Sequence, residues 1–383
     1  MLSNIKSFLK KEPVLSIAAL CALVTVFFVL PDKEYLHYID WRVLCLLFCL
    51  MAVVAGFQAV GFFRWLTELL LKYVRSGRLL SVALVMLPFF SAMAVTNDVA
   101  LLIFVPFTLS LLDELGQKRA QIPMVVLQTV AANLGSMATP VGNPQNLFLY
   151  SAYDLGAGEF FAVTLPLTAV SLVALCAAAL PVLPKALPKQ ERKADASLAK
   201  VRLAIYALLF VLCLLTVLRI VPFVITTAVI VAAFLLLDRK LLKKVDYMLL
   251  LTFVCFFVVS ENLGRIGAVR DLLQGLLEKN TLLTAVGASQ VISNVPAAVL
   301  LSPFTDNWQE LLAGVNIGGL GTPIASLASL ISLKLYMARK DAKVGKFLLV
   351  FTAANIVGLA LLLVFAMLVC QKADTSGEVS LRR

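Results

Sequence analysis

Two stretches of the chain place helix breakers and amide side chains inside apolar sequence. TPVGNPQNL (139–147) holds two prolines, a glycine and two asparagines, and TPIASLASL (322–330) follows a similar pattern. Lipid offers no hydrogen-bond partners, so unwound backbone at membrane depth persists only where it is buried in protein or lines a cavity. A break there frees carbonyl oxygens for a cation and exposes a helix amino terminus to an anion. Both stretches therefore predict binding sites for small charged species.

Two further polar groups lie between pairs of apolar arms. In residues 79–112 the arms flank TND (96–98), and basic residues lie beyond both outer ends. Because like charges mark the same side of a membrane, this segment is predicted to enter and return as a re-entrant hairpin. A second hairpin is predicted over 281–304, centred on SNVP (293–296).

Asp98 is a carboxylate at the predicted tip of the first hairpin. An ionisable residue inside a membrane is costly and usually functional. Asp98 could carry a proton or bind sodium, and it could also cap the returning helix, whose dipole stabilises a negative charge. These roles are compatible, and the sequence leaves them open.

The residue combinations used by intramembrane enzymes are missing from the sequence. The chain has one histidine, His37, in a predicted outer loop, and none of its seven cysteines forms a CxxC pair. Intramembrane proteases need a Ser/His pair, an Asp pair or a zinc motif, and Asp98 has no deep aspartate partner. We therefore expect no enzyme activity, no catalytic residue and no resident cofactor.

The polar residues of the predicted tips and breaks lie on or between predicted membrane helices. Of the 383 residues, 61% are hydrophobic and 14% are charged, whereas average composition is about 45–50% apolar and about 25% charged. Apolar runs of ~20 residues, long enough to cross the hydrocarbon core, recur along the whole length. The composition predicts an all-α polytopic membrane protein, because a membrane β-barrel would show short alternating strands instead.

The net charge of +11 is concentrated in short loops between these runs. This distribution follows the positive-inside rule, so we expect a lipid bilayer and no nucleic acid as partner. With the amino terminus in the cytoplasm, 24 of the 33 Lys and Arg residues fall on the inner side and 9 on the outer side. The asymmetry predicts a multi-pass protein of the cell inner (plasma) membrane with its carboxyl terminus outside.

About nine transmembrane helices accompany the two hairpins in this prediction, and two of the nine are broken. The expected spans are residues 14–30, 42–61, 123–153, 160–183, 203–221, 222–237, 247–263, 311–336 and 347–369. The broken helices are 123–153 and 311–336. The chain divides into a first half (1–184), a cytoplasmic linker (185–202) and a second half (203–383).

The two halves repeat each other in sequence. Asn97 matches Asn294, and nine residues after each asparagine follows the same tripeptide, PFT. Asn133 matches Asn316, and six residues after each asparagine begins the same dipeptide, Thr-Pro. An odd number of crossings between the copies inverts the second copy. Inverted repeats with discontinuous helices are typical of secondary transporters, which bind substrate and coupling ions near the midplane.

At these residues the chain resembles the ion transporter superfamily, which includes divalent anion/sodium symporters, citrate transporters, one class of sodium/proton antiporters and arsenite permeases. The family pattern is a Ser-Asn-Thr hairpin tip and a broken helix of the form (G/T)PxGxPxN in each half. In motif the chain is most similar to the arsenite and anion permease branch. The resemblance implies a scaffold domain, a moving transport domain with an elevator mechanism, and a homodimer.

The resemblance also implies a substrate site and two cation sites, one per repeat, for Na⁺ if sodium is the coupling ion. The substrate would contact Thr96, Asn97, Asn146, Ser293, Asn294 and Ser329. The first cation site would use Asn97, Asp98, Thr139, Gly142 and Asn143. The second would use Asn294, Thr322, Ala325 and Ser326.

The second half departs from the family pattern at several of these positions. Val295 replaces a threonine, and Ala325 and Ser329 replace glycine and asparagine. The loss of polar ligands places the second cation site and dicarboxylate recognition in question.

Together these features predict a secondary active transporter of a small anion, oxyanion or carboxylate, coupled to Na⁺ or H⁺. The alternatives are an arsenite or antimonite efflux permease and a cation/proton antiporter.

Overall fold

The computed structural model describes residues 12–74, 76–186 and 199–380. Within these ranges every regular element is a helix, which confirms the predicted all-α class. Five helices of the described part are long and apolar enough to cross a membrane: Trp41–Ala59, Ala157–Ala179, Lys200–Val217, Tyr247–Arg265 and Val344–Leu368. The protein is therefore an all-α polytopic membrane protein, while the number of crossings and the division into halves stay predictions. Most of the predicted linker, 187–198, lies outside the described residues.

The first half contains eight helices among the described residues. They are α2 (Pro13–Phe28), α3 (Trp41–Ala59), α4 (Phe62–Tyr73), α5 (Gly77–Ala92), α6 (Asn97–Glu114), α7 (Gln121–Ser136), α8 (Pro144–Ala152) and α9 (Ala157–Ala179). Helices α5 and α6 form the first predicted hairpin. Helices α7 and α8 are the two parts of the first predicted broken helix.

The second half follows the same plan after one additional helix, α10 (Lys200–Val217). The further helices are α11 (Phe223–Leu237), α12 (Tyr247–Arg265), α13 (Gly267–Lys279), α14 (Thr281–Ile292), α15 (Asn294–Leu301), α16 (Trp308–Ile317), α17 (Leu327–Met337) and α18 (Val344–Ser380). Helices α14 and α15 form the second hairpin, and α16 and α17 the second broken helix. The last helix continues beyond residue 369, where the predicted span ends.

Matching residues begin matching helices in the two halves. Asp40 accepts a hydrogen bond from the Val43 amide and starts α3, and Asp246 accepts one from the Leu249 amide and starts α12, both at 2.9 Å. Each side chain satisfies one of the amide groups that a helix start leaves without a partner. The shared capping chemistry explains why the two aspartates mark the repeat in the sequence.

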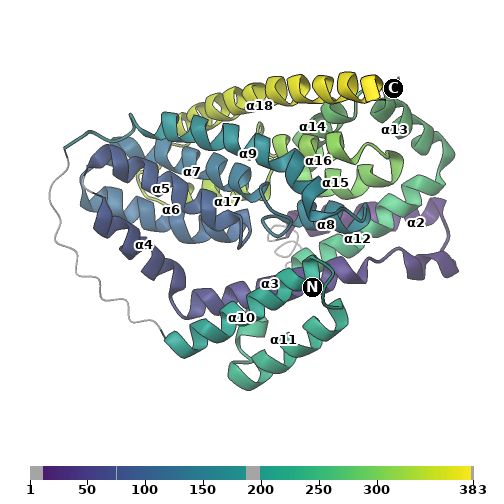
Figure 1. Cartoon of the computed structure of the whole chain (residues 1–383), viewed down its shortest axis with the longest axis horizontal. Coiled ribbons are helices and arrows are strands. Elements are labelled where there is room, and N and C mark those ends of the chain that lie inside the picture. The colour runs from purple at the N-terminus through teal and green to yellow at the C-terminus, as the bar shows by residue number, and fades with distance from the viewer. Residues whose placement is uncertain (1–11, 75, 187–198, 381–383) are drawn as a thin grey trace.

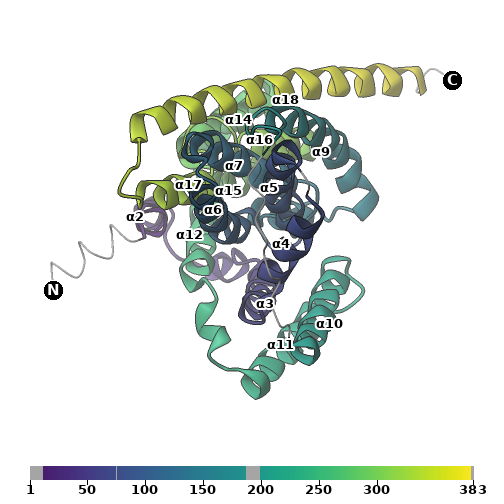
Figure 2. The same cartoon turned by 90° about the vertical axis from the view of Figure 1, so that its left-hand side faces the viewer.

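The helices pack into two groups. Helix α7 is central to one group, with α5, α6, α9, α17 and α18 around it, and α14 packs on α16 in the same group. In the other group α3 packs against α10 and α11, and α12 packs against α2. Figures 1 and 2 show α10 and α11 outermost on one side, with α18 running along the opposite side.

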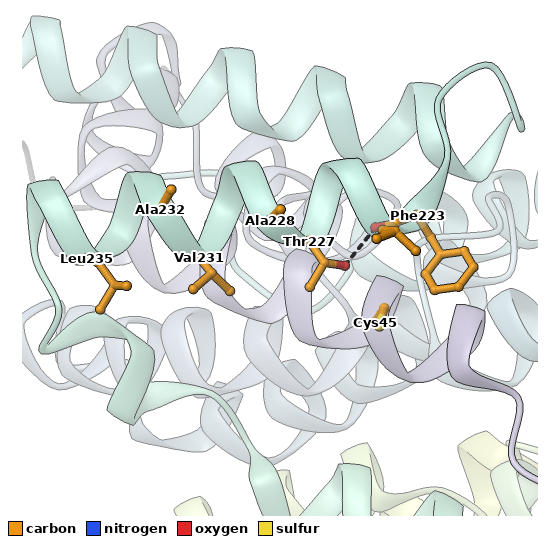
Figure 3. A pocket seen from close by; sticks show the side chains of 8 residues that line it. Cys45, Phe223, Thr227, Ala228, Val231, Ala232 and Leu235 are labelled. Atoms are coloured by element: carbon orange, nitrogen blue, oxygen red, sulfur yellow. Dashed lines mark hydrogen bonds between the residues drawn. The ribbon is translucent and has the colours of Figure 1, made fainter.

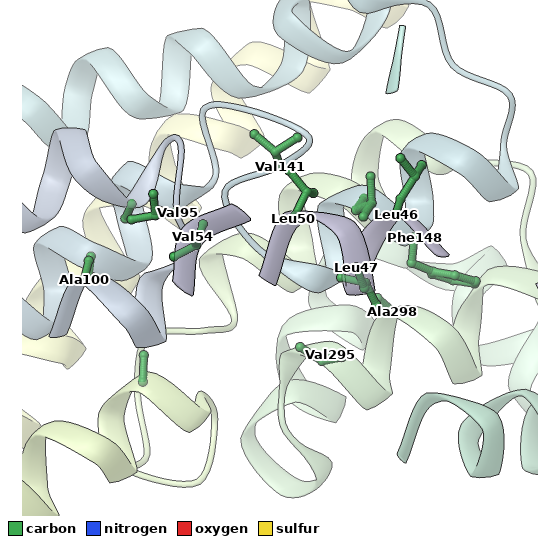
Figure 4. Packing of buried hydrophobic residues seen from close by; sticks show 14 of the residues in the cluster. Leu46, Leu47, Leu50, Val54, Val95, Ala100, Val141, Phe148, Val295 and Ala298 are labelled. Carbon is green, nitrogen blue, oxygen red and sulfur yellow. The ribbon is translucent and has the colours of Figure 1, made fainter. Parts of the chain in front are cut away.

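Helix α3 contributes an apolar face to a buried cluster that includes residues of both repeats. Figure 4 shows Leu46, Leu47, Leu50 and Val54 of this helix between buried side chains of both repeats. Their neighbours in the same buried cluster are Val95, Ala100, Val141, Phe148, Val295 and Ala298. The aliphatic face of α3 thus covers both hairpin tips and the first helix break.

Polar contacts between the groups are fewer and lie at the ends of helices. In the turn after α10, the Arg219 guanidinium pairs with the Asp154 carboxylate at 2.6 Å and donates to the Tyr150 and Asp154 carbonyls. Asp154 belongs to the turn between α8 and α9. This contact joins the outermost helix pair to the helix that follows the first break.

Polar contacts also join each hairpin to the second helix of the other repeat's broken helix. The Tyr153 hydroxyl, at the end of α8, lies 2.9 Å from the carbonyls of Ser302 and Thr305, just after α15. Arg339, just after α17, donates to both carboxylate oxygens of Asp113 near the end of α6, at 2.7 and 3.0 Å. The two repeats are therefore linked crosswise, once through a phenol and once through an ion pair.

Candidate functional site

The two hairpin tips share an unusual backbone conformation. Thr96 and Ser293 precede α6 and α15 and have φ angles of 55° and 74°. A positive φ is uncommon for a residue with a side chain, and such strain tends to occur at functional sites. The next residues, Asn97 and Asn294, are the first of their helices and are buried.

Both predicted broken helices are interrupted. Residues 137–143 separate α7 from α8, and residues 318–326 separate α16 from α17. Pro144 is the first residue of α8, where its missing amide hydrogen costs nothing, and Asn143 caps this helix by accepting from the Asn146 amide at 2.9 Å. The breaks place hydrogen-bonding side chains among buried helices, as the sequence predicts.

Glycine allows the first break to fold back on α7. A Cβ atom at Gly142 would lie 2.1 Å from the Ser136 carbonyl oxygen and 2.9 Å from that of Ala92. No side chain fits at such distances, so Gly142 brings the break into contact with both α7 and the end of α5. This packing explains the glycine in the opening motif.

Asn133 connects the two repeats near the hairpin tips. Its Oδ1 accepts hydrogen bonds from Asn97 Nδ2 at 3.0 Å and from Ser326 Oγ at 2.9 Å. Its Nδ2 donates to the Gly319 carbonyl at 3.4 Å. One buried amide thus joins the first hairpin to the second break.

Asn316, the counterpart of Asn133, joins the second broken helix to the first break. Its Nδ2 donates to Asn146 Oδ1 at 2.7 Å, and its Oδ1 accepts from Asn143 Nδ2 at 3.2 Å. Asn143 Nδ2 also donates to Ser136 Oγ, whose hydroxyl donates to the Asn133 carbonyl at 2.8 Å. The repeat match between Asn133 and Asn316 therefore reflects a two-way exchange of amide contacts.

Each break is tied to the hairpin of its own repeat by a threonine hydroxyl. Thr139 Oγ1 donates to the carbonyl of Met93, and Thr322 Oγ1 donates to the carbonyl of Gln290 at 3.1 Å. Met93 and Gln290 each lie four residues before the asparagine of their hairpin tip. In addition, the Asn294 amide donates to the Ala325 carbonyl at 3.0 Å.

Side-chain amides donate hydrogen bonds to the backbone carbonyl groups that are left free where the helices end. Asn146 Nδ2 lies within 3.4 Å of the carbonyl oxygens of Ser136, Met137 and Thr139. Gln290 Nε2 lies 2.9 Å from those of Gly318 and Leu320. The helix carboxyl ends at the breaks thus receive donors, as buried carbonyl groups require.

Three buried side-chain oxygens near the tips and breaks have no hydrogen-bond partner. They are Asp98 Oδ1, beside the first tip, Gln145 Oε1, in the first turn of α8, and Ser329 Oγ, in the first turn of α17. A buried polar atom without a partner is rare in proteins and points to a role that the protein alone does not fulfil. The unpartnered Asp98 oxygen is not engaged in capping α6.

The structure brings the predicted site residues into one neighbourhood. Asn97, Asn143, Asn146 and Ser326 belong to the network around Asn133 and Asn316, while Thr139, Thr322, Ser293, Asn294 and Ala325 join hairpins to breaks. Thr96, Asp98, Gly142 and Ser329 adjoin these residues along the chain. Their roles in binding stay predictions.

Sequence reasoning did not include Asn133, Asn316 and Gln290 among the site residues. The repeat match between Asn133 and Asn316 was a signal for these two residues. In the structure both asparagines are buried and contact both halves. Gln290 had no such signal, since its repeat counterpart is Met93.

An open apolar groove lies away from this network. Its volume is about 450 Å³, and its walls are residues of α11 together with Cys45 of α3, as Figure 3 shows. Thr227, the polar residue in its lining, uses its hydroxyl to donate to the Phe223 carbonyl at 2.8 Å. None of the predicted site residues lines this groove, and its walls offer nothing to bind a charged solute.

Comparison with known proteins gives the family. The sequence model of the citrate transporter family, CitMHS, matches residues 8–314. An uncharacterized transporter of Methanocaldococcus jannaschii is 34% identical over 92% of this chain and 96% of its own length. Inner membrane protein YbiR of Escherichia coli is 31% identical over 80% of this chain and 83% of its own length.

A more partial match is a silicon efflux transporter of Oryza sativa subsp. japonica, which is 33% identical over 33% of this chain and 26% of its own length. The resemblance expected from the hairpin tips and breaks is confirmed by the family match, which covers most of the chain. The chain belongs to the citrate transporter family and is a polytopic membrane transporter.

Proposed function

We propose that the protein is a secondary active transporter that carries a small anion, an oxyanion or carboxylate, coupled to Na⁺ or H⁺. The observation that supports this most is the arrangement of helix ends. The amino termini of α6, α8, α15 and α17 all lie within the buried network of tips and breaks. Each helix amino terminus carries about half a positive charge and favours an anion.

The helix carboxyl ends in the same region do not cancel this preference. Their carbonyl groups are covered by the amide nitrogens of Asn146 and Gln290. A solute between the hairpin tips would therefore meet positive helix amino termini, of which that of α8 is capped by Asn143, and negative ends that are covered. The proposed substrate contacts are Thr96, Asn97, Asn146, Ser293, Asn294 and Ser329, and the free Ser329 hydroxyl would donate to an anionic oxygen.

The coupling ion is assigned to the first repeat. The Asp98 carboxylate has an oxygen without a partner, and Asn97, Thr139, Gly142 and Asn143 lie around the same tip and break. A cation or proton on Asp98 would offset the negative charge that otherwise repels an anionic substrate. Binding of ion and solute would thereby support each other, which is what a symporter needs.

The helix packing supports an elevator-type movement within a homodimer in the cell inner (plasma) membrane. In this proposal the group around α7 carries the site, and the group around α3, α10 and α11 is the stationary scaffold. The amino terminus would lie in the cytoplasm and the carboxyl terminus outside. Paired single-cysteine accessibility measurements from both sides of the membrane test the orientation.

Efflux of arsenite, antimonite or a similar hydroxylated acid is the second candidate, and cation/proton exchange through Asp98 the third. The unpartnered Asp98 carboxylate supports them, because an uncharged acid would not be repelled by it. One partial relative carries silicon efflux in its name. These candidates differ from the first in the charge of the solute.

A thermal-stability screen of the purified protein separates the candidates. The ligands are citrate, dicarboxylates, sulfate, phosphate and arsenite, each with sodium or potassium at several pH values. A ligand at about 100 times its dissociation constant stabilises the folded state by about 2.7 kcal/mol. An anion that raises the melting temperature only with sodium or at low pH supports the proposal, and stabilisation by arsenite alone supports efflux.

Variants identify the ion site in the same assay and in proteoliposome flux. Asn97→Ala should abolish the sodium shift, and a shift that persists refutes the first cation site. Asp98→Asn should remove the pH dependence of transport if the ion is a proton. Saturable flux with counterflow is expected of a carrier, whereas a channel shows neither.

A further inference from the structure

The second break holds a side-chain amide within a cluster of backbone carbonyl groups. Gln290, from the first arm of the second hairpin, places Nε2 2.9 Å from the carbonyl oxygens of Gly318 and Leu320 and 3.3 Å from that of Val286. The other end of the amide, Oε1, accepts from the Thr322 backbone amide at 2.9 Å. Carbonyls on one side and an N–H on the other fix the orientation of the amide.

The backbone of the break is shaped around this side chain. Gly321 has φ +111°, and a Cβ atom there would lie 2.1 Å from Gln290 Oε1. Asn355 of α18 accepts from the Gly321 amide on the far side. The amide of Gln290 is therefore enclosed by the break rather than resting on its surface.

The first repeat has no such residue on its hairpin. Met93 stands at the position of Gln290 and offers no N–H donor. The carbonyl of Met137, which corresponds to Leu320, is covered by Asn146 from the returning helix α8. The counterpart of Asn146 is Ser329, whose Oγ makes no hydrogen bond. The second repeat has thus replaced an amide on the returning helix by one on the hairpin.

The two hairpin tips also differ in charge. Asp98 of the first tip carries a carboxylate oxygen without a partner, whereas the corresponding residue of the second tip is Val295. The first repeat presents a negative charge that requires a cation. The carbonyl oxygens of the second break receive the Gln290 donor, as those of the first receive the Asn146 donor, and the second tip adds no carboxylate that would require a cation.

Several carbonyl oxygens that converge on one point can be satisfied by a small cation or by a donor group. We propose that the amide of Gln290 takes the place of a coupling cation at the second break, so that only the first repeat binds a coupling ion. This inference rests on the proposed ion-coupled transport. It makes Gln290 the residue that sets the number of coupling ions to one per protomer.

The test exchanges Gln290 for the residue of the first repeat. Gln290→Met removes the N–H donor from the carbonyls of Gly318 and Leu320 and leaves a flexible side chain of similar size, which can rotate away, next to the exposed Thr322. The matched control is Gln128→Met. Gln128 also donates to a backbone carbonyl, that of Leu84, but it is fully buried and lies within the continuous helix α7.

Thermal unfolding is measured for each protein in a sodium series, with choline replacing sodium at constant ionic strength and pH. Without sodium both variants should melt about 5 °C below wild type, because each leaves a buried carbonyl unpaired. The melting temperature of Gln290→Met should rise with sodium beyond the wild-type increment, and that of Gln128→Met should not. Identical sodium responses of the two variants would overturn the inference.

A second variant guards against loss of folding. Gln290→Glu keeps the shape of the side chain but points a carboxylate oxygen at two carbonyl oxygens, so its stability should depend on sodium more steeply than that of wild type. An unchanged sodium dependence in this variant also overturns the proposal.

Failure of the proposed function has a different signature. If wild type shows no sodium response, the first site is not a sodium site, yet the difference between Gln290→Met and Gln128→Met still reports on the second break. A sodium response that persists in Asn97→Ala and disappears on adding Ser326→Ala would place a cation at the second break of the native protein, which the inference forbids.

Discussion

The two helix breaks follow similar paths but are stabilised from different directions. At the first break, Asn143 caps the returning helix α8, and Asn146 of this helix donates hydrogen bonds to the free carbonyl groups. At the second, the equivalent residues are serines, and Gln290 of the hairpin serves the carbonyl groups. The first break is almost wholly buried, whereas Thr322 and Ile324 of the second are exposed. Both breaks therefore need hydrogen-bond donors for their free carbonyl groups. The residue that supplies the donor lies on the returning helix in the first repeat and on the hairpin in the second.

The largest expected effect comes from the two asparagines that link the repeats. Asn133→Ala leaves Asn97 Nδ2 and Ser326 Oγ without an acceptor, and should lower the free energy of unfolding by about 3–5 kcal/mol. Asn316→Ala should cost about 2–3 kcal/mol, because Asn143 keeps Ser136 as a partner. Denaturation in detergent micelles measures both. Equal losses would contradict the unequal coupling described for the two breaks.

The glycines of the breaks come next. Gly142→Ala brings a methyl group against backbone oxygens, and Gly321→Ala combines a contact with Gln290 and a positive φ. Each should lose about 2–4 kcal/mol of stability. Gly275→Ala, in helix α13 with open space around it, is the control and should be neutral or stabilising by up to about 1 kcal/mol. A tolerated Gly321→Ala would show that the amide of Gln290 is not enclosed.

The threonine tethers should differ between the breaks. Thr139→Val removes the hydroxyl that donates to the Met93 carbonyl, in a mostly buried segment, and should cost about 1.5 kcal/mol. Thr322→Val should cost only about 0.5 kcal/mol, since Thr322 is exposed and its backbone amide still donates to Gln290. Melting temperatures of the two variants in one buffer check the order. The reverse order would mean that Gln290 contributes little to the second break.

The crosswise links between repeats give small effects and a distinct pH dependence. Arg339 lowers the pKa of the Asp113 carboxyl by a direct hydrogen bond. The link is therefore fully present above the ordinary pKa of a carboxyl and is lost as the pH falls through the lowered value. Arg339→Gln should cost about 1 kcal/mol at neutral pH, since the pair is partly exposed, and progressively less in acid.

The matching link through Tyr153 provides the control. Tyr153→Phe loses the hydroxyl that contacts the Ser302 and Thr305 carbonyls, and should also cost about 1 kcal/mol. This loss should stay constant across the same acidic range, because neither a phenol nor a carbonyl ionises there. A parallel pH dependence in both variants would show that the Asp113 pair is not its cause.

Much of the fold could be predicted from the sequence because its signals are local. Proline, glycine and asparagine within apolar runs marked both breaks, and the aspartates before Trp41 and Tyr247 marked helix starts. The hairpins followed from polar tips between apolar arms. The predicted last span, 347–369, agrees with the apolar window Val344–Leu368, while helix α18 continues to Ser380 through polar residues, which hydropathy alone does not reveal.

The candidate site was predicted only where short motifs at the tips and breaks mark it in the sequence. Asn97 and Asn143 were found because they fit a motif, but their contacts with Asn133 and Asn316 depend on how the halves meet. Gln290 could not be found, since its importance arises from a donor missing at Ser329, about 40 residues away in sequence. A compensation between distant positions has no local signature.

The aliphatic face of α3 has a kinetic consequence. Branched and apolar side chains make its contacts with the hairpin tips, the first break and α8. Such side chains do not fix a single position of one helix along another. Dispersion contacts of this kind are individually weak and can be exchanged one for another during sliding. Under the proposed movement, friction along α3 would be small. The rate would instead depend on the rupture of directional contacts such as Arg219 with Asp154, making that turn the place to tune turnover without touching the solute.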